Sequence, residues 1–262
     1  MKNTLYPYLE KFWKYRSLLV ELIKRDLKVK YRRSYLGYLW SLLNPLLMML
    51  VVNAVFSSFF RYDIPNFPVY LLTGQILFNF YNESTTMAMS SILGGAALIK
   101  KVALPKYIFP ISRVLSCFIN LLFSLVAIVI VFFVTRTPFH WQIVLFPFPL
   151  FYILAFSMGV GMILSILAVY FRDIVHLYGV MLTALMYLTP IFYPMSILPE
   201  YVQAIVHLNP LFYFIQMFRN VTMYGIFPSL TDHLVCLVIS GGTLLIGVLV
   251  FVKNQSKFVL HI

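Results

Sequence analysis

The chain alternates between long apolar runs and short polar connections. Six runs are long enough to cross a bilayer, because about 20 consecutive apolar residues span its hydrocarbon core. These runs cover residues 38–60, 69–93, 111–134, 146–170, 174–193 and 232–252. The pattern predicts an all-α polytopic membrane protein in which residues 38–262 form a six-span transmembrane domain and residues 1–37 form a cytoplasmic interface segment.

The segment before the first run has the pattern of an amphipathic helix. Its apolar residues recur at steps of three and four: Leu18, Leu19, Leu22, Ile23, Leu27 and Tyr31. Two acid-before-base pairs, Glu21 with Arg25 and Asp26 with Lys30, have the i,i+4 spacing that favours a helix. Such a basic helix, leading directly into a span, is expected to lie on the cytoplasmic surface. Two interpretations stay open: a simple flank of the membrane anchor, or a docking surface for a cytoplasmic partner.

The distribution of basic residues predicts the orientation. The formal net charge is +12, and 17 of the 20 Lys and Arg residues fall on connections that share one side of a six-span chain. The other side holds only Arg61, Arg136 and Arg219. By the positive-inside rule, both termini are expected in the cytoplasm. Because the basic excess follows the topology, it indicates contact with membrane lipid and argues against nucleic acid.

Composition excludes several classes of function. Hydrophobic residues make up 61% of the chain and charged residues 11%, against about 25% charged in soluble domains. No GxxxxGK[ST] motif is present, so the chain has no loop of this kind to bind the phosphates of ATP. The five His residues are scattered, and Cys117 and Cys236 lie in apolar runs, where we expect free packing thiols. We therefore expect neither an enzyme nor a metal site nor a bound cofactor in this chain.

Polar and small residues distinguish three of the runs. In the second run, Asn79, Glu83, Thr86 and Ser90 share one helical face. A carboxylate at mid-bilayer depth costs at least about 2.5 kcal/mol, so this face should meet protein or a water-filled path. Interhelical hydrogen bonding and channel lining both explain it. The fourth and sixth runs carry small residues that predict close helix packing; these are Ser157, Gly159, Gly161 and Ser165, and Gly241, Gly242 and Gly247.

The segment between the fifth and sixth runs contains two short helical patterns. One covers residues 199–206 and follows Ser196, a possible cap, and the other covers residues 210–223. The second pattern begins with Asn209 and Pro210, which suit the N-cap and first position of a helix. Both are too short to cross a bilayer. We expect them to be re-entrant or interfacial helices at the outer leaflet.

Five motifs occur along the chain in a characteristic order. They are RDLKVKYRRSYLGYLWSLLNPLLMMLV, LIKKVALPKYIFPISRVLS, YFRDI, LTPIFYPMSILP and LNPLFYFIQMFR. The ordered set resembles the membrane subunit of type-2 ABC exporters for bacterial surface polysaccharides such as O-antigen, capsule and teichoic acid. The resemblance implies a homodimer in the bacterial cytoplasmic (inner) membrane, with two separate ATPase subunits that hold ATP and magnesium. It also implies that lipid-linked polysaccharide passes through a channel between the two copies.

The resemblance further implies which residues contact the ATPases. In the amphipathic helix these are Lys24, Arg25 and Lys28. In the two short cytoplasmic connections they are Leu104, Pro105, Lys106, Tyr107 and Ile108, and Phe171, Arg172, Asp173 and Ile174. Family members often carry an Arg-Glu pair after the first proline, whereas this chain has Lys106 and Tyr107, so we assign no specific salt bridge there. By pattern alone, both connections are equally compatible with plain turns.

Aromatic side chains stack on sugar rings, and an outward cluster of them is the expected lining of a sugar path. Together with the polar residues of the second run, the expected path residues are Asn79, Glu83, Tyr187, Phe192, Tyr193, Tyr213 and Phe218. The aromatic belt at the membrane interface is a strong alternative explanation for the same aromatics. The alternative function is a permease of the same fold for a drug, haem or small lipid. A membrane-embedded enzyme is disfavoured because Glu83, Asp173 and Glu200 fall at three different depths, and an assembly protein is disfavoured by the intramembrane carboxylate.

Overall fold

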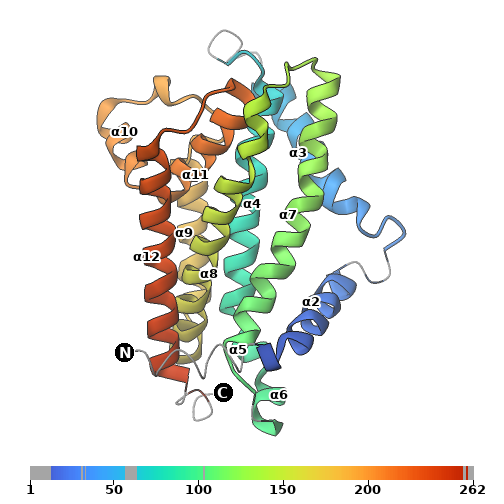
Figure 1. Ribbon diagram of the computed structural model, residues 1–262, viewed down its shortest axis with the longest axis vertical. Helices are drawn as coiled ribbons and strands as arrows, with labels where there is room; N and C mark the ends of the chain where they lie inside the picture. Colours follow the sequence, from blue (N-terminus) through green and yellow to red (C-terminus); the bar gives the residue numbers. More distant parts are fainter. Residues whose placement is uncertain are drawn as a thin grey trace.

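The computed structural model describes residues 13–30, 32, 34–56, 64–102, 104–255 and 258, and this part of the chain is helical without a β-strand. Its long helices run side by side along the long axis, and α2 packs against the lower part of α7 (Figure 1). The longer helices are α2 (Arg16–Lys30), α3 (Leu39–Phe56), α4 (Phe67–Met89), α7 (Ile108–Val134), α8 (Pro147–Tyr170), α9 (Ile174–Leu188) and α12 (Leu230–Asn254). The shorter elements are α5 (Ser91–Gly94), α6 (Ala96–Lys101), η1 (Trp141–Leu145), η2 (Met195–Ile197), α10 (Glu200–His207), α11 (Pro210–Arg219) and η3 (Asn220–Tyr224).

Four of the described helical stretches are long and apolar enough to cross a membrane. They are α3, α7, α12 and the continuous stretch Trp141–Tyr170, which joins η1 to α8. They overlap the apolar runs predicted at 38–60, 111–134, 146–170 and 232–252, although residues 57–60 lie outside the described residues. The predicted interface segment 1–37 is likewise described only in part.

α4 is the central helix, and it differs in kind from these four. It packs against both α7 and α8, and 17 of its 23 residues are buried. Because protein rather than lipid surrounds it, α4 tolerates polar side chains, several of which bond back to its own carbonyls. The Thr73 hydroxyl donates to the carbonyl of Val69 and the Thr85 hydroxyl to that of Tyr81. The helix ends at Met89, four residues before the predicted end of the second run.

α9 is shorter than the predicted fifth run, which extended to residue 193. It has 15 residues, equivalent to about 22 Å, which falls short of a typical hydrocarbon core of about 30 Å. The helix stops because Thr189 precedes Pro190, and a residue before proline is driven out of the helical region. Thr189 accordingly has the extended values φ −93° and ψ 129°.

The segment that follows folds back over the upper part of the bundle, as the position of α10 and α11 in Figure 1 shows. The predicted cap is confirmed, because the Asn209 side chain accepts a hydrogen bond from the Leu211 N–H with Pro210 in the first turn. The proposed cap at Ser196 is wrong, since α10 begins after Pro199 and has no side-chain cap. α11 buries six of its ten residues, so it is a core element and not a surface helix.

Close packing of α8 and α12 depends on two glycines. A Cβ on Gly159 would lie 2.5 Å from the carbonyl oxygen of Thr243, and a Cβ on Gly247 would lie 2.5 Å from the carbonyl oxygen of Gly159. The backbones of the two helices therefore touch at this point, as small residues permit. The packing role expected for Gly241 and Gly242 is wrong, because no neighbour lies within 4 Å of a Cβ built at either position.

Candidate functional site

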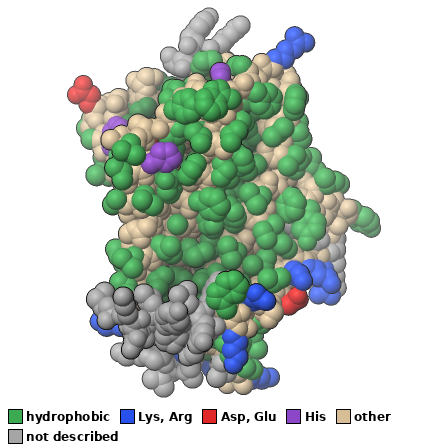
Figure 2. All heavy atoms as spheres, in the orientation of Figure 1, with side chains coloured by type: hydrophobic (Ala, Val, Ile, Leu, Met, Phe, Trp, Pro, Cys, Tyr) green, Lys and Arg blue, Asp and Glu red, His purple; other side chains and the backbone are tan. Residues whose placement is uncertain are grey.

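Basic residues gather at one end of the molecule. Figure 2 shows Lys and Arg side chains around α2 and α6 at the lower end of this face, with another at the upper end. Among the described residues, every Lys and Arg other than Arg136 and Arg219 belongs to α2 or the residues just before it, to the turn after it, to the lower ends of α6, α7 and α12, or to the connections there. Lys2, Lys11, Arg33, Arg61 and Lys257, which also entered the charge count, lie outside the described residues.

α2 is fixed to the bundle by its apolar face. Leu19 and Leu22 are buried and pack with Ile108 at the start of α7. The opposite face leaves Lys24, Arg25 and Lys28 exposed. The helix therefore combines a docked apolar side with an exposed basic side.

The acidic residues of α2 make pairs that the helical spacing did not predict. Asp26 is buried, and its Oδ1 lies 2.8 Å from Nη1 of Arg113 on α7 and 3.1 Å from Nη2 of Arg25. Glu21 pairs with Lys24, three residues later, at 2.9 Å. The expected Glu21–Arg25 and Asp26–Lys30 pairs are wrong, because burial of α2 on α7 brings a stronger partner to Asp26 than its own helix offers.

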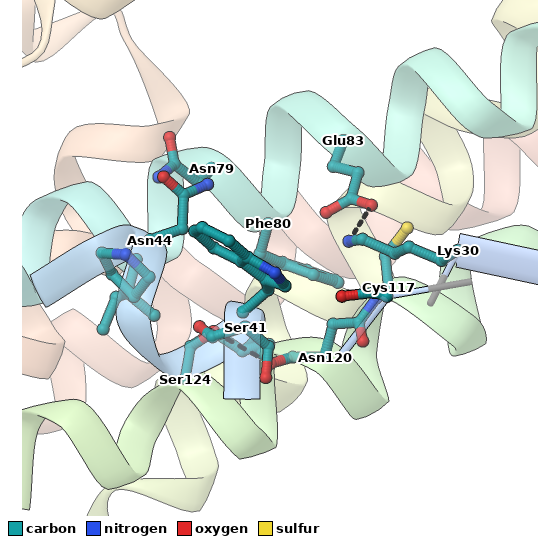
Figure 3. Close-up of a pocket in the computed structure, with 14 residues that line it drawn as sticks. Lys30, Ser41, Asn44, Asn79, Phe80, Glu83, Cys117, Asn120 and Ser124 are labelled. Carbon is teal, nitrogen blue, oxygen red and sulfur yellow. Dashed lines mark hydrogen bonds and ion pairs between the residues drawn. The ribbon is translucent and has the colours of Figure 1, made fainter. Parts of the chain in front are cut away.

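Glu83 also finds its partner on α2. Its Oε1 lies 2.5 Å from Nζ of Lys30, as Figure 3 shows. Both side chains are 37% exposed, so this carboxylate is paired and partly accessible instead of being isolated at mid-bilayer depth. Two side chains 53 positions apart in sequence meet here. This long-range pairing explains how α4 carries a carboxylate.

A polar pocket opens beside this ion pair. Its volume is about 360 Å³, and α3, α4 and α7 supply its walls. Figure 3 shows Ser41 and Asn44 of α3, Asn79 and Phe80 of α4, and Cys117, Asn120 and Ser124 of α7 around it. Of the expected path residues, this pocket therefore brings together Asn79 and Glu83 and none of the aromatic ones.

The two short connections present different surfaces. In the first, Leu104 to Tyr107 are half-buried and Ile108 is buried under α2. The Lys106 ammonium donates to the carbonyl of Gln255 and lies 5.7 Å from the ring centroid of Phe258, and burial lowers the pKa of Lys106. In the second, Phe171, Arg172 and Asp173 are exposed. Of the two connections, only the second projects into solvent, while the first contacts the residues at the end of α12.

The aromatic residues expected along a sugar path differ in their exposure. Phe218 is buried at 2% exposure in the core formed by α4, α8 and α11, so it packs and does not line a path in this protomer. Tyr187 is 62% exposed, and its carbonyl accepts a hydrogen bond from the Tyr193 hydroxyl. The Tyr213 hydroxyl donates to the carbonyl of His207. Tyr187 is thus the most exposed aromatic of this set.

Arg219 is a structural residue that sequence reasoning placed among the outward loop charges. It is buried at 1% exposure, and its guanidinium donates to the carbonyls of Pro190 at 2.8 Å and Tyr70 at 3.0 Å. The guanidinium also stacks on the Tyr70 ring at 3.4 Å, and a Cβ on Gly74 would lie 2.6 Å from its Nη2. Arg219 therefore joins α11, the turn after α9 and α4 at one point.

The described part of the chain holds no group of three or more His, Cys, Asp or Glu side chains placed to bind a metal ion. Cys117 and Cys236 are buried free thiols, as predicted.

Comparison with known proteins places this arrangement in a family. Residues 17–223 match the family model described as ABC-2 type transporter. The chain is 33% identical over 250 residues to an O-antigen export system permease protein RfbA of Klebsiella pneumoniae, covering 92% of this chain and 93% of that protein. It is 34% identical over 188 residues to the protein of the same name from Myxococcus xanthus, covering 72% of each.

A more distant relative is the polysialic acid transport protein KpsM of Escherichia coli, which is 23% identical over 213 residues and covers 78% of this chain and 80% of that protein. The family match extends from α2 to η3, so it includes the docked amphipathic helix, the pocket, both connections and the Arg219 contact. The chain is a multi-pass membrane protein and belongs to the ABC-2 type transporter family as a membrane subunit, without ATPase activity of its own.

Proposed function

We propose that this chain is the transmembrane subunit of an ATP-driven exporter that moves lipid-linked polysaccharide across the bacterial cytoplasmic membrane. The relatives named for O-antigen export, which match over most of the chain, support this substrate class. In this proposal α4 and α9 complete a set of six spans, and the basic end of the molecule faces the cytoplasm.

The channel is proposed to lie between two copies of the chain. This arrangement is supported by the poor burial of two helices within one protomer. α9 buries only Tyr178 and Leu182 of its 15 residues, and α3 buries only Pro45, Met49 and Val52 of its 18. A second copy would cover part of these faces.

Energy is proposed to come from two separate ATPase subunits that bind ATP and magnesium. The observation that carries this part of the proposal is that the basic face of α2 and the exposed connection at 171–173 lie at the same end of the bundle (Figure 1). Because α2 is joined to α4 and α7 by ion pairs, a push on α2 would move those helices as rigid bodies.

The decisive experiment combines purification with an activity assay. We expect the chain, extracted from its native cells, to bring down an ATPase and to stimulate its hydrolysis of ATP in lipid. The substitution Arg172→Glu reverses the charge of the exposed second connection. It should lower export at least tenfold, while the chain and the ATPase still assemble. The matched control Glu200→Lys, at the exposed start of α10 on the opposite end, should export normally. Normal export by Arg172→Glu would show that residues 171–174 form a plain turn.

A permease of the same fold for a drug, haem or small lipid is the alternative. Cells that lack this chain discriminate between the two functions. Accumulation of lipid-linked glycan on the cytoplasmic side supports polysaccharide export, whereas normal surface glycan would contradict it.

A further inference from the structure

The pocket between α3, α4 and α7 has the size of a ligand site. Its volume of about 360 Å³ falls in the range of about 300–1,000 Å³ that small-molecule sites occupy. It opens to the surface of the protomer, because Trp40, Asn44 and Asn79 on its rim are all exposed. Most of the lining residues belong to α3, α4 and α7, and Lys30 and Ser34 come from the end of α2 and the connection after it.

Two amides in this pocket have unused hydrogen-bonding capacity. Within the described part of the chain, the side-chain amides of Asn44 and Asn79 form no hydrogen bond, and each amide offers both a donor and an acceptor. Both project from helices that otherwise pack in apolar surroundings (Figure 3). An amide that faced lipid would leave its polar atoms unsatisfied, at a cost of about 1–3 kcal/mol. The two side chains are therefore suited to a polar occupant.

The charge in the pocket is already neutralised. Among the described residues of its lining, only Lys30 and Glu83 are charged, and they pair with each other. Arg25 and Arg113 lie outside this lining, and both form ion pairs with Asp26. An anionic phosphate would have to break these pairs, whereas a neutral group rich in hydroxyls would add hydrogen bonds to them.

Aromatic surface completes the lining. Trp40 is 44% exposed, and Phe80, which also lines the pocket, is buried at 3% exposure. An indole with an open face offers a broad apolar surface with a polar edge, which suits one face of a pyranose ring. Aromatic rings beside amide groups form the combination that binds neutral sugars.

We propose that this pocket binds a neutral sugar residue of the transported glycan, with Trp40 as the stacking surface and Asn44 and Asn79 as hydrogen-bond partners. This inference rests on the proposed function, because it takes the exported glycan as the ligand. It places a sugar contact beside α2, on the cytoplasmic side of the molecule in that orientation, and away from the outer aromatic cluster.

The test uses the native glycan in cells that produce it. A photoreactive benzoylphenylalanine replaces Trp40, and after irradiation the protein is purified and probed for attached glycan. The matched control carries the same group at Leu39, which is the adjacent residue of α3, is 56% exposed and does not line the pocket. A third variant carries it at Tyr187 on α9, which samples the proposed channel.

Glycan attached at position 40 at least fivefold above position 39 supports the proposal. Glycan at position 187 with none at position 40 overturns the pocket and leaves the exporter function standing. No glycan at either position counts against both. Attachment of phospholipid alone at position 40 identifies a lipid site, and attachment to a second copy identifies a protomer contact; either result overturns the sugar assignment.

The amides provide a second readout. Asn79→Ala or Asn44→Ala removes one hydrogen-bond partner, worth about 0.5–1.5 kcal/mol, so the yield at position 40 should fall about 2- to 10-fold. Asn82→Ala removes an amide from the same helix α4 outside the pocket and should leave the yield unchanged. Equal yields for Asn79→Ala, Asn44→Ala and Asn82→Ala would refute the hydrogen-bonding role.

Discussion

The ion pair between Asp26 and Arg113 should determine how firmly α2 is held on the bundle. The Asp26 side chain is 2% exposed and meets Arg113 at 2.8 Å and Arg25 at 3.1 Å. Replacement by the isosteric Asn removes the charge and keeps the shape. Hydrogen bonds between charged groups contribute about 1.5–3 kcal/mol each. Because Arg113 and Arg25 remain 25% and 51% exposed, water compensates part of the loss, and we expect a net cost of about 2 kcal/mol.

Hydrogen exchange measures this cost directly, because we expect α2 to open separately from the long helices. A loss of about 2 kcal/mol corresponds to roughly 30-fold faster exchange of the α2 amides in Asp26→Asn. The amides of α8 should keep their protection. The matched control is Glu21→Gln on the same helix, whose ion pair with Lys24 is 68% and 66% exposed and is worth about 0.2–1 kcal/mol. Its α2 amides should exchange less than about 5-fold faster.

A double-mutant cycle tests whether the pair itself carries the effect. Asp26→Asn combined with Arg113→Gln should cost at least 1 kcal/mol less than the sum of the two single changes. The reasoning is refuted if Asp26→Asn and Glu21→Gln change α2 exchange equally, or if the cycle shows no coupling.

Three further predictions concern packing, the buried cation and topology. Gly159→Ala should destabilise the purified protein by about 1–3 kcal/mol in denaturant unfolding, because its methyl group meets the backbone of α12, whereas Gly241→Ala should be neutral or slightly stabilising; equal effects would contradict the close contact. Arg219→Lys should lower the unfolding midpoint more than Arg219→Met, because Lys keeps the buried charge but cannot form both hydrogen bonds to the carbonyls of Pro190 and Tyr70. The reverse order would show that the charge of the side chain, and not its two hydrogen bonds, stabilises the protein. A cysteine at Arg172 should react with an impermeant thiol reagent only from the cytoplasmic side, and one at Glu200 only from outside; the opposite pattern would invert the proposed orientation.

The sequence predicted the elements well wherever a local signal existed. Apolar runs located the spanning helices, and Asn209–Pro210 located the start of α11. The end of α9 was misplaced because apolar residues continue past the proline that stops the helix. Hydropathy reports where a chain avoids water, whereas the backbone constraint at Thr189–Pro190 decides where its helix ends.

Long-range partners escaped prediction. Glu83 was recognised as unusual from its apolar setting, but its pairing with Lys30 depends on how α2 lies against α4, which no local pattern contains. Asp26 was assigned to its own helix for the same reason. Gly247 and Gly241 are both glycines of α12. Only the tertiary structure shows that Gly247 packs against α8 and that Gly241 does not. Trp40 and Asn44 gave no separate signal because the pocket exists only once three helices meet.

The position of Arg219 has a consequence for biogenesis. Among the described residues, the Arg219 guanidinium has no acidic partner, so we expect it to enter the interior only after the carbonyls of Tyr70 and Pro190 are in place to accept its hydrogen bonds. The ribosome makes α4 first, the turn at Pro190 next and α11 afterwards, so the acceptors precede the donor. Insertion of the last third of the chain therefore depends on the correct placement of α4. In a chain whose α4 fails to integrate, the charge of Arg219 would stay unpaired in the membrane, and quality-control proteases would degrade that chain.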